Sequence, residues 1–282
     1  SANGGAIAIS ADGATIVWSQ DNTAARRSTT DGTSWTACTG APSGGTFAPV
    51  ADRANASKFY IYNQNTGALH VSTDAGATFT SAATLPTGAA RLRAVPGFEG
   101  HLWIPCWSGG LRRSIDSGAS FSAVSSVQEG YAVGFGRAAP GQSHPAVFLW
   151  GKVGGVVGLF RSDDTGATWV RINDDRHQFG YIGMITGDPR VFGRVYVAGN
   201  LGIVYGEIPA VLPAYAWAPF TAGVSGSWTP PAHSSPYAPA FSATGLPAWA
   251  TIDGATGAIH GVATDPAGTI TQAVVTAAAG GQ

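Results

Sequence analysis

A short motif that recurs at nearly constant spacing constrains the fold more than any other feature of the sequence. It reads Ser-x-Asp-x-Gly-x-Thr/Ser-aromatic and occurs in full at 72–79, 114–121 and 162–169. A degraded copy ends at Trp35 and has Thr30 where the Asp is expected. Successive terminal aromatic residues are 44, 42 and 48 residues apart. A period of about 45 residues indicates a β-propeller in which each repeat forms one four-stranded blade.

Short extended segments separated by Gly or Pro support this interpretation. The third repeat predicts strands at 91–94, 101–105, 110–114 and 120–124. The fourth predicts strands at 131–136, 146–151, 157–162 and 168–172. A fifth unit has only three candidate strands, at 180–185, 194–198 and 202–208, and no motif. Units near 5–37 and 46–82 fit more loosely. We therefore expect an all-β fold with about five blades, four of them complete.

The composition agrees with an all-β chain and excludes several classes of function. Gly accounts for 40 of 282 residues, and charged residues for only 11%. The formal net charge of −1 argues against nucleic acid or an anionic membrane as partner. Residues 208–252 carry no charged side chain, but their eight prolines exclude a membrane-spanning helix. The N-terminus lacks the basic and apolar regions of a signal peptide.

No cofactor or metal site is expected. Two cysteines, Cys38 and Cys106, cannot form a disulfide scaffold or a four-ligand metal site. We expect both to be small buried residues, with a single disulfide as the alternative. The six histidines show no paired ligand spacing, and no phosphate-binding or dinucleotide-binding motif is present.

The motif itself has a structural explanation. We expect each copy to form the turn between the third and fourth strands of a blade. The carboxylate can accept hydrogen bonds from backbone N–H groups of its own turn, and Gly supplies a positive φ. A structural role is therefore predicted for three Asp-Gly pairs: Asp74 with Gly76, Asp116 with Gly118, and Asp164 with Gly166.

These repeats resemble the Asp-boxes of sialidases, sortilin-type receptors and some glucanases. The connecting residues 5–18, 131–137, 146–152 and 173–180, with 186–190 and 193–197, resemble the second propeller of glycoside hydrolase family 74. Members of that family are xyloglucan-active endo-β-1,4-glucanases. The resemblance covers residues 1–208 and implies part of a seven-bladed propeller.

The resemblance also implies partners and a location. Two propellers would face each other across a cleft that holds the glucan, and each would supply one catalytic Asp. No position here matches the Asp of the second propeller, so no catalytic residue is assigned. Both are expected upstream of Ser1, together with the first propeller. The implied substrate is xyloglucan or a related β-1,4-glucan. The implied protein is extracellular, with its signal peptide outside this chain.

The C-terminal part has a different character. Residues 209–225 are rich in Ala, Pro and Gly and are interpreted as a linker. Residues 226–282 contain Gly-Leu-Pro followed by Ile-Asp-Gly-Ala-Thr-Gly, and resemble the immunoglobulin-like or cadherin-like modules of bacterial secreted enzymes. We expect a small β-sandwich that acts as a spacer rather than as a sugar-binding module.

Propeller geometry places the substrate on the face opposite the motif turns. The loops expected there are 19–23, 38–46, 63–67, 106–110, 123–130, 152–156 and 173–180. Trp107 could stack on a sugar ring; the alternative is a partly exposed aromatic residue between blades. His177 and Gln178 could line the cleft or cap the exit loop of the fourth blade. Asp174 and Lys152 lie on the same face. Asp174 and Asp175 are adjacent on an extended segment, so they point apart and do not suit a catalytic pair.

Two other functions remain open from the sequence. A non-catalytic five-bladed propeller could bind carbohydrate or protein, and its last blade would then be closed by a strand from residues 1–10. A sialidase would need an arginine cluster that holds a carboxylate, together with a tyrosine nucleophile. No such arrangement is visible in the sequence.

Overall fold

The computed structural model describes residues 4–45, 47–200, 202–206, 221–229, 239–264 and 274–279. The chain divides into two compact units, Ser1–Gly206 and Glu207–Gln282. Every regular element among the described residues is a β-strand. The all-β expectation is therefore confirmed. None of the described residues forms a helix long and apolar enough to cross a membrane.

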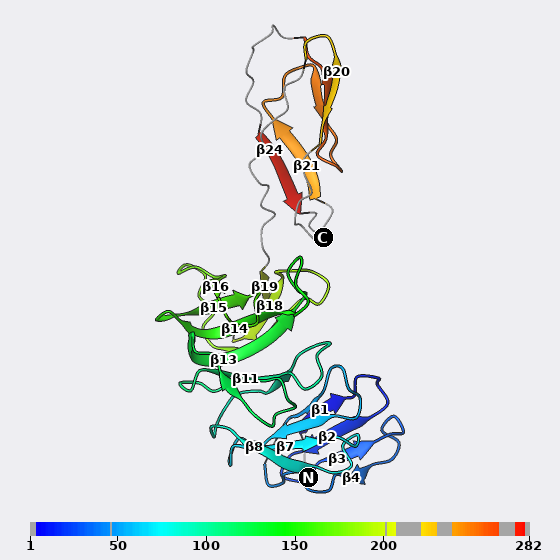
Figure 1. Ribbon diagram of the computed structural model, residues 1–282, viewed down its shortest axis with the longest axis vertical. Coiled ribbons are helices and arrows are strands. Elements are labelled where there is room, and N and C mark those ends of the chain that lie inside the picture. Colours follow the sequence, from blue (N-terminus) through cyan, green and yellow to red (C-terminus); the bar gives the residue numbers. More distant parts are fainter. Residues whose placement is uncertain are drawn as a thin grey trace. The chain divides into compact units, whose positions relative to one another are not determined.

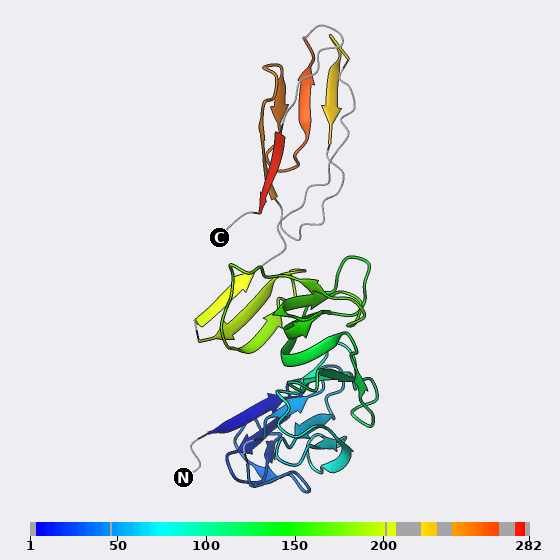
Figure 2. The ribbon, with the colours of Figure 1, turned by 90° about the vertical axis from the view of Figure 1, so that its left-hand side faces the viewer.

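The first unit consists of five antiparallel sheets that follow one another in chain order, from blue to yellow (Figure 1, Figure 2). The first sheet contains β1 (Gly5–Ile9), β2 (Ile16–Gln20), β3 (Arg26–Ser28) and β4 (Thr36–Ala37). The second contains β5 (Pro49–Ala51), β6 (Phe59–Tyr62), β7 (Ala68–Ser72) and β8 (Thr80–Thr84). The third contains β9 (Arg93–Ala94), β10 (Leu102–Pro105), β11 (Leu111–Ser114) and β12 (Ser122–Ala123).

The last two sheets of the unit continue the pattern. The fourth contains β13 (Val127–Gly136), β14 (Ala146–Val153), β15 (Val156–Ser162) and β16 (Val170–Arg171). Among the described residues, the fifth contains β17 (Ile182–Gly187), β18 (Val195–Gly199) and β19 (Gly202–Gly206). The described strands thus form four four-stranded blades and one three-stranded blade. This is the expected partial propeller, which is confirmed.

Two of the expected loops are shorter than predicted. Residues 123–130 were expected as a loop, which is wrong for Val127–Gly130 because these residues extend β13. Register shifts at Val127/Glu129 and Gly130/Ala132 interrupt their pairing with β14. Such bulges break the regular alternation from which a strand is recognised in a sequence. The expected loop 152–156 is a two-residue turn at Gly154 and Gly155, both with positive φ, as tight hairpins prefer.

The N-terminal strand belongs to the first sheet. β1 pairs with β2 over its whole length, and the fifth sheet has three strands among the described residues. A closed five-bladed ring would require a strand from residues 1–10 on the fifth sheet, and the observed pairing of β1 is a different one. Large apolar side chains are exposed on both terminal sheets: Ile7 and Ile9 on β1, and Ile203 and Tyr205 on β19.

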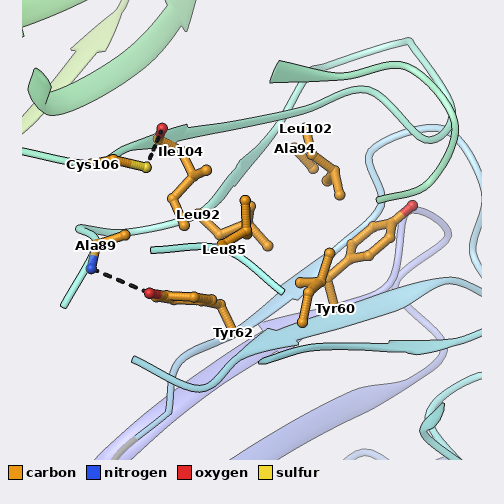
Figure 3. Packing of buried hydrophobic residues seen from close by; sticks show 10 residues of the cluster. Tyr60, Tyr62, Leu85, Ala89, Leu92, Ala94, Leu102, Ile104 and Cys106 are labelled. Carbon is orange, nitrogen blue, oxygen red and sulfur yellow. Dashed lines mark hydrogen bonds between the residues drawn. The ribbon is translucent and has the colours of Figure 1, made fainter. Parts of the chain in front are cut away.

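Buried clusters between neighbouring sheets form the core of this unit. One cluster joins the second and third sheets and includes Tyr60, Leu102 and Ile104, each fully buried (Figure 3). The buried Tyr62 hydroxyl accepts a hydrogen bond from Ala89 N, so polar groups at the edge of the cluster remain paired. The blades are thus held together by side chains rather than by shared strands.

A second repeated contact, a hydrogen bond between an Asp and a Tyr, fixes the turn after the first strand of a sheet. Asp52 follows β5 and is fully buried; its carboxylate accepts hydrogen bonds from Tyr60 Oη, at 2.8 Å, and from three backbone N–H groups. Asp188 occupies the same place at the end of β17 and accepts from Tyr196 Oη at 3.1 Å. Each Asp precedes its Tyr by eight residues. Burying a carboxylate without hydrogen-bond partners is costly, so both pairs have a structural explanation.

The described residues of the second unit form two small sheets. β20 (Ser225–Trp228), β23 (Ile259–Val262) and β22 (Ala250–Ile252) form one, and β21 (Pro239–Thr244) and β24 (Val274–Ala279) form the other. Two small sheets agree with the expected β-sandwich. Most of the segment interpreted as a linker, residues 209–220, lies outside the described residues.

Candidate functional site

The motif turns, which we define as residues 28–35, 72–79, 114–121 and 162–169, direct their polar groups into their own backbone. At 114–121, Asp116 Oδ1 accepts a hydrogen bond from Ser120 N at 3.0 Å, and Ser114 Oγ accepts from Gly118 N at 2.9 Å. Hydrogen bonds from the Ser120 hydroxyl and backbone and from Ser114 lower the pKa of Asp116 to about 2. The other two complete copies repeat these contacts.

The degraded copy keeps the same geometry without the carboxylate. Thr30 Oγ1 accepts a hydrogen bond from Ser34 N at 3.0 Å, and Ser28 Oγ accepts from Gly32 N at 2.9 Å. A hydroxyl thus replaces one of the two carboxylate oxygens. This substitution supports the proposal that the Asp residues of the motif are structural.

The opposite ends of the blades enclose a cavity of about 510 Å³. Residues on the first strand of each of the five sheets line it. We call these strands, β1, β5, β9, β13 and β17, the innermost strands. We call this cavity the channel mouth. Its larger side chains are Tyr62, Gln64, Arg91, Arg93, Trp107, Tyr131, Tyr181 and Met184. An apolar and aromatic lining with a few polar groups is typical of a site for a small molecule or a saccharide.

Trp107 has an unusual backbone at this mouth. It follows β10, its φ is +50°, and its side chain is 44% exposed. An isolated bridge holds it: Trp107 N donates to Gly130 O at 2.8 Å, and Gly130 N donates to Trp107 O at 2.9 Å. A bulky residue with positive φ is strained, and such strain concentrates at functional sites.

Three aromatic rings form a row that begins at Trp107. The Trp107 and Tyr131 ring centroids are 5.5 Å apart, and those of Tyr131 and Trp150 are 5.9 Å apart. Tyr131 donates a hydrogen bond to Glu129, which raises the pKa of Tyr131 to about 12. Lys152 Nζ lies 3.1 Å from Glu129 Oε1. Lys152 therefore supports the row through Glu129.

The loop at 173–180 is folded on itself. Asp174 Oδ1 accepts hydrogen bonds from His177 Nδ1, when that nitrogen is protonated, at 2.6 Å, and from His177 N at 2.8 Å. Gln178 Nε2 donates to Asp174 O at 3.3 Å. The His177 hydrogen bond is the largest cause of the lowered pKa of Asp174. A general acid needs a raised pKa, so this geometry favours the capping interpretation of the loop.

Of the five residues expected to contact substrate, only Trp107 lines the channel mouth; Lys152, Asp174, His177 and Gln178 do not. The sequence analysis missed the tyrosines Tyr62, Tyr131 and Tyr181 and the arginines Arg91 and Arg93. They come from four different sheets, so no local motif joins them. They share a position, near the start of the first strand of a sheet or at the end of its second strand. This shared position would have been a usable signal.

The His, Cys, Asp and Glu side chains of the described residues are the candidate ligands of a metal site. Among them, no group of three is placed to hold a metal ion. Cys38 and Cys106 are both buried and free. The expectation of two small buried thiols is confirmed, and burial raises the pKa of each.

Comparison with known proteins relates the first unit to one enzyme family. The chain is 47% identical over 211 residues to a xyloglucanase of Acetivibrio thermocellus, covering 73% of this chain and 25% of that protein. The crystal structure of the glycoside hydrolase family 74 enzyme of Niastella koreensis matches with 42% identity and a TM-score of 0.68, covering 71% of this chain and 30% of that one. The family 74 xyloglucanase of Xanthomonas campestris matches with 36% identity and a TM-score of 0.65, covering 72% and 29%.

The second unit matches a separate family, described as Putative Ig domain, over residues 207–282. The chain spans about a quarter of the length of the xyloglucanase that it matches. The two solved structures and the curated relative relate the first unit to the same enzyme family. The chain therefore belongs to glycoside hydrolase family 74 through its first unit and carries an immunoglobulin-like module in its second.

Proposed function

We propose that the first unit forms one wall of the xyloglucan-binding cleft of a secreted endo-β-1,4-glucanase. The observation that carries this proposal is the exposed Trp107 ring at the channel mouth, in a unit 47% identical to a xyloglucanase. The C–H face of a sugar ring packs on such an aromatic surface. Tyr131 lines the mouth beside Trp107, and Trp150 is the next ring of the row.

The catalytic carboxylates are proposed to come from outside residues 1–282. Glycoside hydrolysis needs two carboxyl groups, one of them protonated at the start of the reaction. Among the described residues, no Asp or Glu lines the channel mouth. The nearby Glu129 has a pKa lowered by hydrogen bonds from Tyr131 and Lys152, and the pKa of Asp174 is lowered too. These ionised groups do not suit the role of general acid.

The terminal sheets offer surfaces for the rest of the propeller. Ile7 on β1 is 62% exposed and Ile203 on β19 is 77% exposed. Apolar side chains on the first and last sheets of an incomplete ring suit contact with further blades. We propose that upstream blades of the same enzyme cover them.

Calorimetric titration with xyloglucan oligosaccharides tests the binding surface. Trp107→Ala should weaken binding about tenfold, which is about 1.4 kcal/mol, with little change in melting temperature. Trp107→Gly removes the ring and suits the positive φ, so it provides a second, stable variant. Ile115→Ala is the matched control, because Ile115 is 61% exposed in the same sheet on a motif turn. Equal affinity in wild type and both Trp107 variants would refute the binding surface.

Reducing-sugar release tests the assignment of catalysis. The 282-residue chain should release no reducing sugar from xyloglucan. Asp174→Ala and Asp175→Ala should leave this result and the oligosaccharide affinity unchanged. Turnover by the chain that either substitution abolishes would move catalysis into the loop at 173–180.

A further inference from the structure

The channel mouth continues into a second cavity. This cavity has a volume of about 540 Å³ and is lined by the opposite ends of the same five innermost strands. The two cavities share five lining residues, namely Ile7, Pro49, Val50, Leu92 and Arg93. Together they form a channel along the inner strands, and Arg93 lies where the two cavities meet.

The channel has a positive lining. Arg91 and Arg93 line the mouth, and Arg53 and Arg93 line the second cavity. In the part of the chain that the structure describes, no Asp or Glu lines either cavity. Arg91 and Arg93 are two residues apart in the chain, and both line the mouth. Burial lowers the pKa of Arg93, and the charge of Arg91 lowers it further. Two cations that line one cavity favour an anion as ligand.

Arg93 also lacks the partners that other arginines in this unit have. Arg161 Nε lies 3.0 Å from Asp163, and Arg113 Nη1 donates to Thr165 O at 2.8 Å. Among the described residues, no hydrogen bond or ion pair engages the Arg93 guanidinium, and Arg91 contacts only Met184 Sδ, at 4.0 Å. Asp52 precedes Arg53, but Tyr60 and backbone N–H groups already occupy its carboxylate. A half-buried cation without a counter-charge is costly.

We propose that the channel mouth binds an oxyanion between the guanidinium groups of Arg91 and Arg93, either the carboxylate of an acidic sugar or a free inorganic anion. A guanidinium presents paired N–H donors that match the oxygens of a carboxylate, sulfate or phosphate. The volume of about 510 Å³ accommodates a sugar ring. Trp107 and Tyr131 line the same cavity, so the ring of an acidic sugar would contact them. This site shares Trp107 and Tyr131 with the proposed xyloglucan surface, but recognition of the anion by the two arginines does not require neutral xyloglucan to bind.

The test is calorimetric titration of the full chain with sodium sulfate and with sodium glucuronate, at an ionic strength held constant with sodium chloride. Wild type should bind at least one anion saturably, whereas glucose should give no comparable signal. Arg93→Gln should weaken this binding at least tenfold. Arg137→Gln removes the same charge outside both cavities, where Arg137 donates to Arg190 O, and should change the affinity less than twofold.

The comparison between ligands identifies the source of the anion. Tighter binding of glucuronate than of sulfate assigns the site to an acidic sugar, and the reverse order assigns it to an inorganic anion. The inference is overturned if wild type binds neither anion saturably, or if Arg137→Gln weakens binding as much as Arg93→Gln. Arg91→Gln serves as a second variant if Arg93→Gln does not fold. Titration with neutral xyloglucan oligosaccharide in parallel keeps the proposed function separately testable.

Discussion

The two ends of the blades in the first unit use their polar groups in opposite ways. At the motif turns, the carboxylates and hydroxyls accept hydrogen bonds from their own backbone, as Asp116 does from Ser120. At the channel mouth, Arg93 has no partner among the described residues, and Trp107 is exposed with a positive φ. The comparison teaches that repeated residues stabilise this fold, whereas the residues free to bind a ligand occur once each.

The largest expected difference between the two ends concerns their glycines. A Cβ on Gly118, in a motif turn, would lie 2.4 Å from Leu69 Cδ2, and the φ of Gly118 is +84°. Gly118→Ala should therefore lower the free energy of unfolding by about 2–4 kcal/mol. Gly88 at the channel mouth has a φ of +70° and open space around its Cβ, so Gly88→Ala should cost about 1 kcal/mol. Denaturant unfolding of both variants makes the comparison, and equal losses would contradict it.

The next effect isolates the carboxylate of the motif. Asp116→Ala should lower the free energy of unfolding by about 1–3 kcal/mol, because the amide of Ser120 and the hydroxyls of Ser114 and Ser120 lose their acceptor. Asp116→Asn retains one oxygen and should cost less. Oligosaccharide affinity of the folded protein should not change. Lost affinity at an unchanged melting temperature would indicate that the substrate binds at the motif turns rather than at the channel mouth.

A smaller expected effect is that acid lowers the stability of the protein without changing its affinity for neutral oligosaccharide. The pKa of Asp116 is lowered to about 2, so its contribution to stability is complete above its ordinary value of 3.8 and is lost as the pH falls toward 2. Burial lowers the pKa of His101 and of His144, so their contribution is complete above 6.5 and is lost below it. The melting temperature should thus fall with acid. Affinity for neutral oligosaccharide should stay constant between about pH 5 and 8, since no described Asp, Glu or His lines the mouth. An affinity that falls together with the melting temperature would contradict this difference between the two ends.

The fold could be predicted from the sequence to a large extent because its determinants are local and repeated. The predicted strands 101–105 and 110–114 lie within one residue of β10 and β11 at each end. The start of β13 was missed because its irregularities, between Val127 and Glu129 and between Gly130 and Ala132, disrupt the alternation of side chains. The pairing of Asp52 with Tyr60 was also missed, although the same spacing recurs at Asp188 and Tyr196.

The candidate site was only partly predictable. Trp107 was recognised because its loop lies on the face expected to meet the substrate. Its neighbours Arg93 and Tyr131 come from other strands, and their convergence depends on how successive sheets pack. The loop at 173–180 attracted attention through its density of polar residues. Those residues bond mainly to one another, as the contact of Asp174 with His177 shows.

The most direct test of the account is an NMR titration of the tryptophan indole N–H signals with xyloglucan oligosaccharide. The chain has nine tryptophans, and the Trp107→Ala spectrum identifies the signal of Trp107. We expect the Trp107 signal to shift saturably. The signals of Trp35 and Trp169, the aromatic residues of two motif turns, should remain in place. Saturable shifts of Trp35 or Trp169 with no change at Trp107 would contradict the assignment of the binding surface to the channel mouth.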